Sequence, residues 1–303
     1  MSADCGVGRW TRLGWSVGLL GFDFVELDHY RAANRANWSE RVAGHWEPDG
    51  YDAPGFIADP SRISSIVEFD HSYLGDINGR SLLHLQCHFG QDTLSWARLG
   101  AVVTGIDFSA DAIAAARRLS EESGTPGRFV ETELYGTPEA LPGEQFDIVY
   151  TGVGALNWLP DIAGWGGVVA TMLAPGGIFY IRECHPIAWT LRFPIEDPHD
   201  ETLIIQHPYF EVAEPVAWDE GESYLGSASI TNTRTYEWNH GIAEIMSALT
   251  SKGLVIDLFE EHRFLEWQGE HHMIEGDDGR WRLPEHQREL MPLMYSLRAR
   301  RPE

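Results

Sequence analysis

Residues 82–109 constrain the fold of this chain more than any other stretch. An apolar run over 82–85 ends in the tight segment 86–90 (Gln-Cys-His-Phe-Gly), and a short amphipathic segment follows. A second apolar run then stops at Asp107, which lies 21 positions after Gln86. This order predicts a βαβ unit whose first turn binds a ligand and whose second strand ends in a carboxylate suited to ribose hydroxyls.

The following segments continue the alternation of strand and helix. A good N-cap, Ser109, precedes an alanine-rich helix expected over 110–120. A third strand is expected over 128–133, and the near-continuous apolar run 146–153 is typical of a parallel strand covered on both faces. Further strands are expected over 178–183, 254–262 and 293–300, and further helices over 164–173 and 242–251.

The N-terminal region reads as an extension followed by helices. Residues 13–25 are apolar, but the stretch is interrupted by Asp23 and is shorter than the roughly 20 apolar residues of a membrane span. We therefore expect a loosely ordered extension over 1–28 and one domain over 29–303. Residues 27–75, at the start of that domain, should form two helices, over 27–46 and 62–74. A Pro- and Gly-rich loop over 47–60 should join them.

Residues 185–240 interrupt the alternation and are rich in aromatic and acidic side chains. The segment is too long for an ordinary connection, so it should carry its own strands, over 203–206 and 230–238. We call 185–240 the cap. A second long segment, 264–287, is expected to be a polar and aromatic loop.

Charge and cysteine content narrow the classes of function. The formal net charge is −24, which repels phosphate backbones and argues against a nucleic-acid substrate. Three cysteines (Cys5, Cys87 and Cys184) are too few and too widely spaced for a disulfide framework or a zinc site, so a cytoplasmic location is expected. The pair His271–His272 lacks a third ligand at a defined spacing, so no metal is expected.

Residues 82–90 (LLHLQCHFG) resemble the first motif of class I S-adenosylmethionine-dependent methyltransferases, which reads as an apolar pair, an acidic residue and Gly-x-Gly-x-Gly. His84 stands where the acid usually is, Gln86 and His88 replace the first two glycines, and Gly90 is kept. Since only glycine adopts positive φ freely, Gln86 and His88 must avoid that region or adopt it at a cost. The resemblance extends over roughly 30–300 and is greatest to bacterial small-molecule methyltransferases with the sequence QCHFGQDT.

This resemblance implies a Rossmann-like, doubly wound α/β fold with a seven-stranded, mostly parallel sheet, helices on both faces and an inserted β-rich cap. It implies S-adenosylmethionine as the methyl donor and a small-molecule acceptor. The residues expected to bind the donor are Tyr30, Arg41, Gln86, Cys87, His88, Gly90, Asp107, Phe108, Glu133, Leu134, Thr151 and Gly152. Those expected near the acceptor are Asn157, Trp158 and Trp238, and the cap and the segment 264–287 are expected to shape the acceptor pocket.

Several of these assignments have structural alternatives. Tyr30 and Arg41 share one face of the first helix, which is either a lid over the donor or a surface helix. Glu133 either binds the adenine or is a solvated charge at a strand end. The aromatic residues of the cap either stack on a flat acceptor or form its core.

Methyl transfer from a sulfonium is an in-line displacement that many enzymes achieve by positioning alone, so a general base is optional. The best candidates for a base are His185 and His240, because an imidazole titrates near pH 6.5. Each could instead serve its own loop or helix end.

Two rival functions remain open at this point. An NAD-linked oxidoreductase fares poorly, because 86–90 lacks the glycine spacing that lets a pyrophosphate approach the helix. A non-catalytic donor-binding or regulatory protein is kept open by the two missing glycines. The sequence fixes neither the acceptor nor the oligomeric state, and a homodimer is one alternative.

Overall fold

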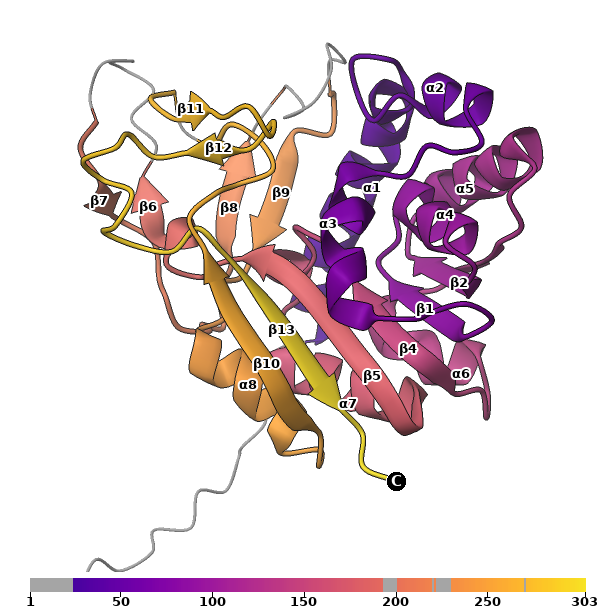
Figure 1. The fold of residues 1–303 in the computed structure, drawn as a ribbon. Coiled ribbons are helices and arrows are strands. Elements are labelled where there is room, and N and C mark those ends of the chain that lie inside the picture. The colour runs from indigo at the N-terminus through magenta and orange to yellow at the C-terminus, as the bar shows by residue number, and fades with distance from the viewer. Residues whose placement is uncertain (1–23, 193–200, 220, 222–229, 270) are drawn as a thin grey trace, which may run out of the picture.

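The computed structural model describes residues 24–192, 201–219, 221, 230–269 and 271–303, and a seven-stranded sheet forms its centre (Figure 1). The strand order is β10-β13-β5-β4-β1-β2-β3. Only β13 runs against its neighbours, pairing antiparallel with both β10 and β5. The bounds are Ser81–Leu85 (β1), Val102–Asp107 (β2), Arg128–Glu131 (β3), Phe146–Thr151 (β4), Leu173–Cys184 (β5), Val255–His262 (β10) and Met294–Arg300 (β13). The predicted fold class is confirmed.

The strand order reverses next to β1, which pairs with β2 on one side and β4 on the other. In sheets of this kind ligands bind beyond the carboxyl ends of the strands, at such a reversal. The turn 86–90 follows β1, and Asp107 is the last residue of β2. The sheet therefore brings together the two features from which the sequence analysis began.

Helices cover both faces of the sheet, as Figure 1 shows. Side chains alternate in direction along a strand, so Leu83 and Val149 pack with α7 and α8, whereas Leu82 and Ile148 pack with α3 and α4. The helix bounds are Phe24–Trp46 (α1), Ala53–Ala58 (α2), Ser65–Leu74 (α3), Gln91–Arg98 (α4), Ala110–Ser123 (α5), Thr137–Ala140 (α6), Ile162–Met172 (α7) and Ile242–Thr250 (α8).

The N-terminal region differs from expectation in two places. Helix α1 begins at Phe24, inside the predicted extension, while residues 1–23 lie outside the described part of the chain. The segment expected to be a loop contains α2, because Asp52 accepts a hydrogen bond from the Gly55 N–H at 3.0 Å and Pro54 is compatible with the first helical turn. The loop prediction gave the local Pro and Gly content too much weight.

The cap contains short strands, as predicted, although they are shorter than expected. β7 covers Ile204–Ile205 and pairs with β6 (Leu191–Arg192), and β9 covers Arg234–Glu237 and pairs with β8 (Val216–Asp219). The predicted loop 264–287 also contains a hairpin, β11 (Ile274–Glu275) with β12 (Trp281–Arg282). All three small sheets lie toward the end of the large sheet to which β5 points (Figure 1).

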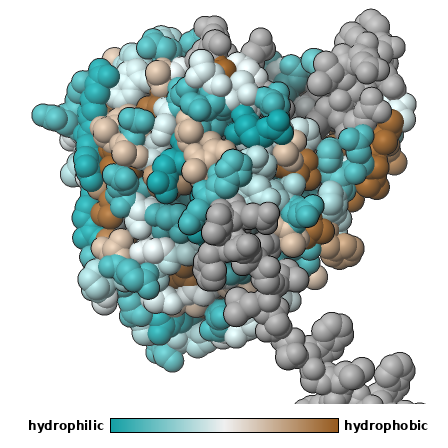
Figure 2. Space-filling view, turned by 180° about the vertical axis from the view of Figure 1, so that it is seen from behind, coloured by the Kyte–Doolittle hydropathy of each residue, from teal (hydrophilic) through white to brown (hydrophobic). Residues whose placement is uncertain are grey.

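The face of the molecule seen in Figure 2 is mostly polar. On the face opposite to that in Figure 1, hydrophilic and intermediate residues cover most of the visible area, and hydrophobic ones form small separate groups (Figure 2). Of the helices described, none is both long enough and apolar enough to cross a membrane.

A buried ion pair joins α3 to the middle of the sheet. Asp70 of α3 accepts a hydrogen bond from Arg182 Nε of β5 at 2.6 Å, and both side chains are inaccessible to solvent. The hydroxyls of Tyr150 and Tyr180 also donate to this carboxylate. Arg182 in turn contacts Glu266, which lies in the segment that carries the β11–β12 hairpin. The pair therefore connects a helix, two central strands and that segment.

We expect Asp70→Ala to lower the free energy of unfolding by about 3–5 kcal/mol, because it leaves the buried Arg182 charge without its main partner. Urea denaturation measures the change. The control is Glu289→Ala, which removes an exposed pair with Arg263 and should cost at most about 1 kcal/mol. Equal effects of the two substitutions would contradict this account of the pair.

Candidate functional site

A cavity of about 930 Å³ lies at the carboxyl ends of β1, β2 and β4. This volume is near the upper end of the range for ligand sites, 300–1,000 Å³, so it can hold more than one small molecule. The turns that follow the strands form its floor, and α1 covers one side. Residues 50–51 and 62–68, the start of α4, the cap and the segment 265–293 supply the rest. We refer to it below as the cavity.

The turn 86–90 keeps the backbone shape of the glycine motif although two glycines are missing. Gln86 and His88 have φ of 57° and 50°, and Gly90 has φ of 77°. Gln86 is held by a hydrogen bond from its Nε2 to the Ala155 carbonyl at 2.9 Å, and His88 Nε2 lies 3.1 Å from His45 Nδ1. The predicted cost of positive φ is therefore present, and contacts of the two side chains offset part of it.

Gly90 is required for a steric reason as well. A Cβ at this position would lie 2.5 Å from the Phe129 ring, and the backbone there is left-handed. Cys87 fills the core beneath the turn, where burial raises the pKa of its thiol well above the usual value. Buried Cys184 behaves in the same way, so the predicted role of both as small buried residues is confirmed.

Asp107 is bound directly to the turn. Its carboxylate accepts hydrogen bonds from the His88 N–H and the Ser109 N–H, each at 2.9 Å. Burial raises its pKa to about 6, against the effect of these N–H donors. Phe108 follows with its ring 5.7 Å from the Arg35 guanidinium, and both Asp107 and Phe108 line the cavity.

Glu133 lies two residues after β3, which ends earlier than predicted. It forms an ion pair with Arg31 of α1 at 3.2 Å. Burial raises the pKa of Glu133, and the Arg31 charge acts in the opposite direction. Glu133 and Leu134 both line the cavity, so the structure is compatible with the binding role expected for them and Glu133 is not a free strand-end charge.

Helix α1 does cover the cavity, and of the two residues predicted on its face Arg41 lines the cavity whereas Tyr30 does not. Arg31, Asn34, Trp38 and Arg41 line the cavity. Tyr30 instead packs against Tyr236 and Trp238 outside it, with ring centroids 4.5 and 5.8 Å away. The spacing of 3, 4 and 3 residues from 31 to 41 was available in the sequence.

The same helix is held against β9. The Asn34 side chain donates to the Tyr236 carbonyl and accepts from the Tyr236 N–H, both at 2.8 Å. Glu40 accepts hydrogen bonds from the N–H groups of Thr231 and Asn232. We call these contacts the α1–β9 clamp. It joins segments that lie about 200 residues apart in the chain.

The loop after β4 carries three of the predicted residues into the cavity: Gly152, Asn157 and Trp158. The Trp158 ring lies edge-on to Trp38, with centroids 5.3 Å apart. Thr151 is buried at the end of β4 and does not line the cavity. Trp238 is also buried outside it, and its backbone N–H donates to the Asn157 carbonyl at 2.8 Å.

Glu183 holds this loop in place, a role that the sequence analysis missed. Its buried carboxylate accepts hydrogen bonds from the N–H groups of Gly154, Ala155, Leu156 and Cys184, at 2.7–3.1 Å. A carboxylate can accept this many bonds, and charge-assisted bonds are the strong ones. An acidic residue at the end of an otherwise apolar strand was the signal that could have indicated it.

The two histidines proposed as bases do not line the cavity. His185 Nε2 pairs with Glu261 at 3.1 Å, and its Nδ1 accepts from the Ile187 N–H. His240 Nδ1 lies 2.8 Å from Glu211, and its Nε2 lies 2.8 Å from the Leu159 carbonyl. Each ring nitrogen of these two histidines contacts a group of the protein. The alternative in which each histidine serves its own loop or helix end therefore describes both residues.

One part of the cavity is apolar, and most of its residues come from the two segments that were expected to shape the acceptor pocket, 185–240 and 264–287. We define this apolar half by six residues: Trp189, Leu191, Leu265, Met273, Leu283 and Leu293. They come from the start of the cap and from segments around β11 and β12. Their pairing across the chain depends on tertiary contacts, so no local pattern reveals it.

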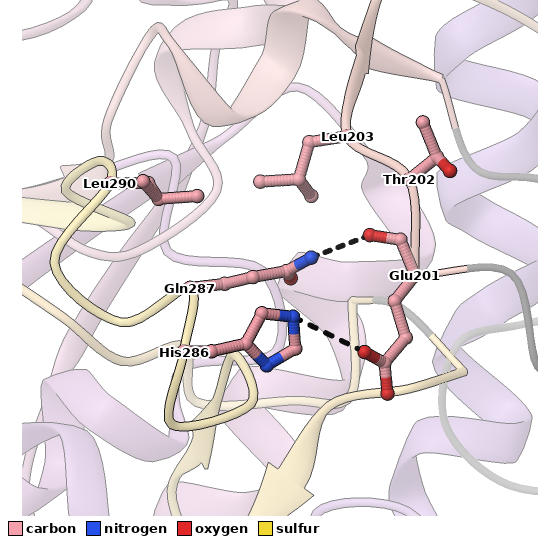
Figure 3. A pocket seen from close by; sticks show the side chains of 6 residues that line it. All are labelled: Glu201, Thr202, Leu203, His286, Gln287 and Leu290. Atoms are coloured by element: carbon pink, nitrogen blue, oxygen red, sulfur yellow. Dashed lines mark hydrogen bonds and ion pairs between the residues drawn. The ribbon is translucent and has the colours of Figure 1, made fainter.

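A second hollow, of about 480 Å³, lies beside β7 (Figure 3). Gln287 donates from Nε2 to the Glu201 carbonyl at 2.6 Å, and His286 lies 3.4 Å from the Glu201 carboxylate. Both contacts join residues that line the hollow itself, and none of the predicted site residues lies there. Within the described ranges, no group of three or more metal-binding side chains occurs here or elsewhere.

Comparison with known proteins agrees with this geometry. Residues 83–179 match a family model described as a methyltransferase domain. The ubiquinone biosynthesis O-methyltransferase of Albidiferax ferrireducens is 32% identical over 210 residues, covering 68% of this chain and 81% of the relative. The corresponding protein of Sodalis glossinidius is 31% identical over 182 residues, which cover 56% of this chain and 71% of the relative. This chain belongs to the class I S-adenosylmethionine-dependent methyltransferases.

Other relatives are matched over less of their length: the chain spans 64% and 60% of the corresponding proteins of Paramagnetospirillum magneticum and Rhodopseudomonas palustris. Solved structures share the fold. Methyltransferases from Mesorhizobium loti and Listeria monocytogenes give TM-scores of 0.53 and 0.51 at 21% and 20% identity. Each comparison covers 78% of this chain and 98% of the other.

The residues of this methyltransferase fit S-adenosylmethionine, which would supply an electrophilic methyl group. Asp107 lines the cavity beside the turn, and so do the apolar residues Phe108 and Leu134. Asn157, only 6% exposed, has a buried side-chain oxygen without a hydrogen-bond partner in the described structure. Such a group calls for a ligand or water.

The strain in the turn can be measured by comparing two variants at one position. Gln86→Gly should be more stable than Gln86→Ala by about 1 kcal/mol, because both lose the bond to Ala155 but only glycine accepts φ of 57° freely. Urea midpoints provide the comparison. At Ala114, exposed in α5, the order should reverse, and Ala114→Gly should cost about 1 kcal/mol.

For the loop after β4, Glu183→Gln should lower the free energy of unfolding by about 1–3 kcal/mol, since the amide places N–H groups against backbone N–H groups. Hydrogen exchange should accelerate at Gly154, Ala155 and Leu156. Glu131→Gln, at the exposed end of β3, is the matched control and should change neither quantity. Unchanged exchange in Glu183→Gln would refute the assigned role.

Proposed function

We propose that this protein transfers a methyl group from S-adenosylmethionine to a small-molecule acceptor by in-line displacement. The observation that carries the proposal is the continuity of one cavity, from the turn 86–90 and Asp107 to the apolar half. A donor bound at the first end would direct its methyl group along the cavity. An acceptor at the second end would lie in line with it.

The lining of the apolar half favours an acceptor with a flat or branched apolar body. Besides Trp189, the indole rings of Trp158, Trp218 and Trp267 line the cavity. Aromatic side chains provide large contact areas with preferred stacking geometries. The names of the relatives refer to O-methyltransferases of ubiquinone biosynthesis, so phenolic compounds are the first acceptors to test.

The position of the two histidines supports a reaction driven by alignment and by exclusion of water. Neither His185 nor His240 lines the cavity, whereas α1 and the cap cover much of it. An acceptor already deprotonated in solution, or one that loses its proton after transfer, needs no base. The chain's contribution is then to hold both molecules in the reactive arrangement.

S-Adenosylmethionine and its demethylated product should each stabilise the protein, by about 2.7 kcal/mol at 100 times Kd. Thermal unfolding with and without ligand measures this, and NAD should cause no shift. A panel of phenols and amines should then yield S-adenosylhomocysteine with at least one member. Absence of any shift would refute the proposal, and a shift without turnover would favour the non-catalytic alternative.

A further inference from the structure

Two side-chain amides in the cavity wall each have an oxygen that receives no hydrogen bond. Asn157 and Gln86 both line the cavity, and the side-chain oxygen of each is buried without a partner among the described residues. Asn157 as a whole is only 6% exposed. Buried acceptors normally have a partner, so a ligand that brings N–H or O–H groups would complete both amides.

The two amides belong to the same part of the cavity, beside the loop after β4. Gln86 Nε2 donates to the Ala155 carbonyl at 2.9 Å, which identifies the oxygen end of that amide and places it two residues from Asn157. The χ2 angle of an asparagine rotates broadly, so Asn157 can turn its oxygen toward a ligand. An amino group donates two hydrogens and a hydroxyl one, so two acceptors suit an amino group.

The charges on this side of the cavity are acidic. Within the described chain, the loop after β4, the cap and the segment 265–293 place two charged residues on the cavity, Glu237 and Glu266. Glu266 also pairs with Arg182 and Arg280. The arginines of the lining belong instead to α1 and to the segment before α3. A phenolate beside the loop after β4 would therefore meet carbonyl oxygens and carboxylates, which disfavour an anion.

An aromatic amine also needs no base, because it is neutral at physiological pH and its nitrogen carries a lone pair. A phenol titrates near pH 10 and becomes a strong nucleophile only after it loses its proton. The histidines of the lining, His84 and His88, are weak bases. Burial lowers the pKa of His84 to about 3 and that of His88 well below its usual value.

A donor without a partner lies farther along the cavity. Trp218 of β8 lines the cavity, and its Nε1 is buried and unpartnered in the described structure. Trp218 pairs with Thr235 of β9, three residues before Trp238, which is about 10 Å along an extended strand. The Trp238 backbone N–H contacts Asn157, so Trp218 suits an acceptor atom on the body of the substrate, such as a ring nitrogen.

We propose that the methyl acceptor is a flat aromatic amine whose amino group is positioned by the side-chain oxygens of Asn157 and Gln86. This inference rests on the proposed function and names its substrate class. The amine lone pair forms a bond to the methyl carbon, the carbon–sulfur bond breaks with its electron pair left on sulfur, and the methylated nitrogen releases a proton to water. The products are an N-methylamine and S-adenosylhomocysteine, unlike those of the O-methyltransferases named among the relatives.

Binding to the wild-type protein saturated with S-adenosylhomocysteine tests the amino group without turnover. Isothermal titration calorimetry should compare 6-aminoquinoline with 6-hydroxyquinoline, and 4-butylaniline with 4-butylphenol. We expect an amine to bind at least about tenfold more tightly than its phenol, a difference of about 1.4 kcal/mol, because a hydroxyl leaves one acceptor unpaired. A phenol that binds as tightly as its amine, or binding of neither amine, would overturn the inference.

Two variants separate hydrogen bonding from the shape of the wall. Asn157→Leu has a similar volume but no acceptor, so the preference for 6-aminoquinoline over 6-hydroxyquinoline should fall to less than about threefold, whereas Asn157→Asp keeps an oxygen and should retain it. The affinity for S-adenosylhomocysteine should change less than about twofold in both variants. An unchanged preference in Asn157→Leu would contradict the assigned role.

Failure of the inference can be told apart from failure of the proposed function. If the wild-type protein bound no S-adenosylhomocysteine, methyl transfer itself would be refuted. If it bound S-adenosylhomocysteine and methylated 6-hydroxyquinoline in preference to 6-aminoquinoline, methyl transfer would stand and the assignment of an amine acceptor would fall.

Discussion

The hydrogen bond from the His88 N–H to the Asp107 carboxylate connects the two halves of the βαβ unit at the point where the sheet reverses. It fixes the turn after β1 relative to the end of β2, while His88 adopts the left-handed conformation that such a turn requires. The Cys87 N–H also donates to the Ile106 carbonyl of β2 at 2.8 Å, so two bonds position the backbone that forms the floor of the cavity. The shape of the glycine motif thus depends on its hydrogen bonds as well as on glycine itself.

Glu183 has the same role in the loop that follows β4. One buried carboxylate stabilises the backbone of 154–156 at the end of β4, as another stabilises the turn at the end of β1. Carboxylates suit this task because each can accept several N–H bonds at once. The cavity floor is therefore built from two loops, each held by an acid on a neighbouring strand.

The sequence predicted those parts of the molecule that follow from local patterns. Apolar runs located β1, β2 and β4, and the spacing of Gln86 and Asp107 located the donor side of the cavity. It assigned the segments 185–240 and 264–287 to the acceptor pocket but not their individual apolar side chains, such as Leu191 and Leu283, which meet only in the folded chain. On α1 the prediction placed Arg41 at the cavity, as the structure does, but it also expected a ligand contact from Tyr30, which contacts Tyr236 instead.

The α1–β9 clamp affects how ligands enter and leave the cavity. Because Asn34 is bonded to Tyr236 and Glu40 to residues 231–232, a molecule that enters or leaves on this side must first separate the two segments. The cost of that opening is shared between a helix at one end of the chain and a strand more than half its length away. The time that a ligand stays bound would then depend on the residues of the α1–β9 clamp, which do not contact the ligand's reactive centre.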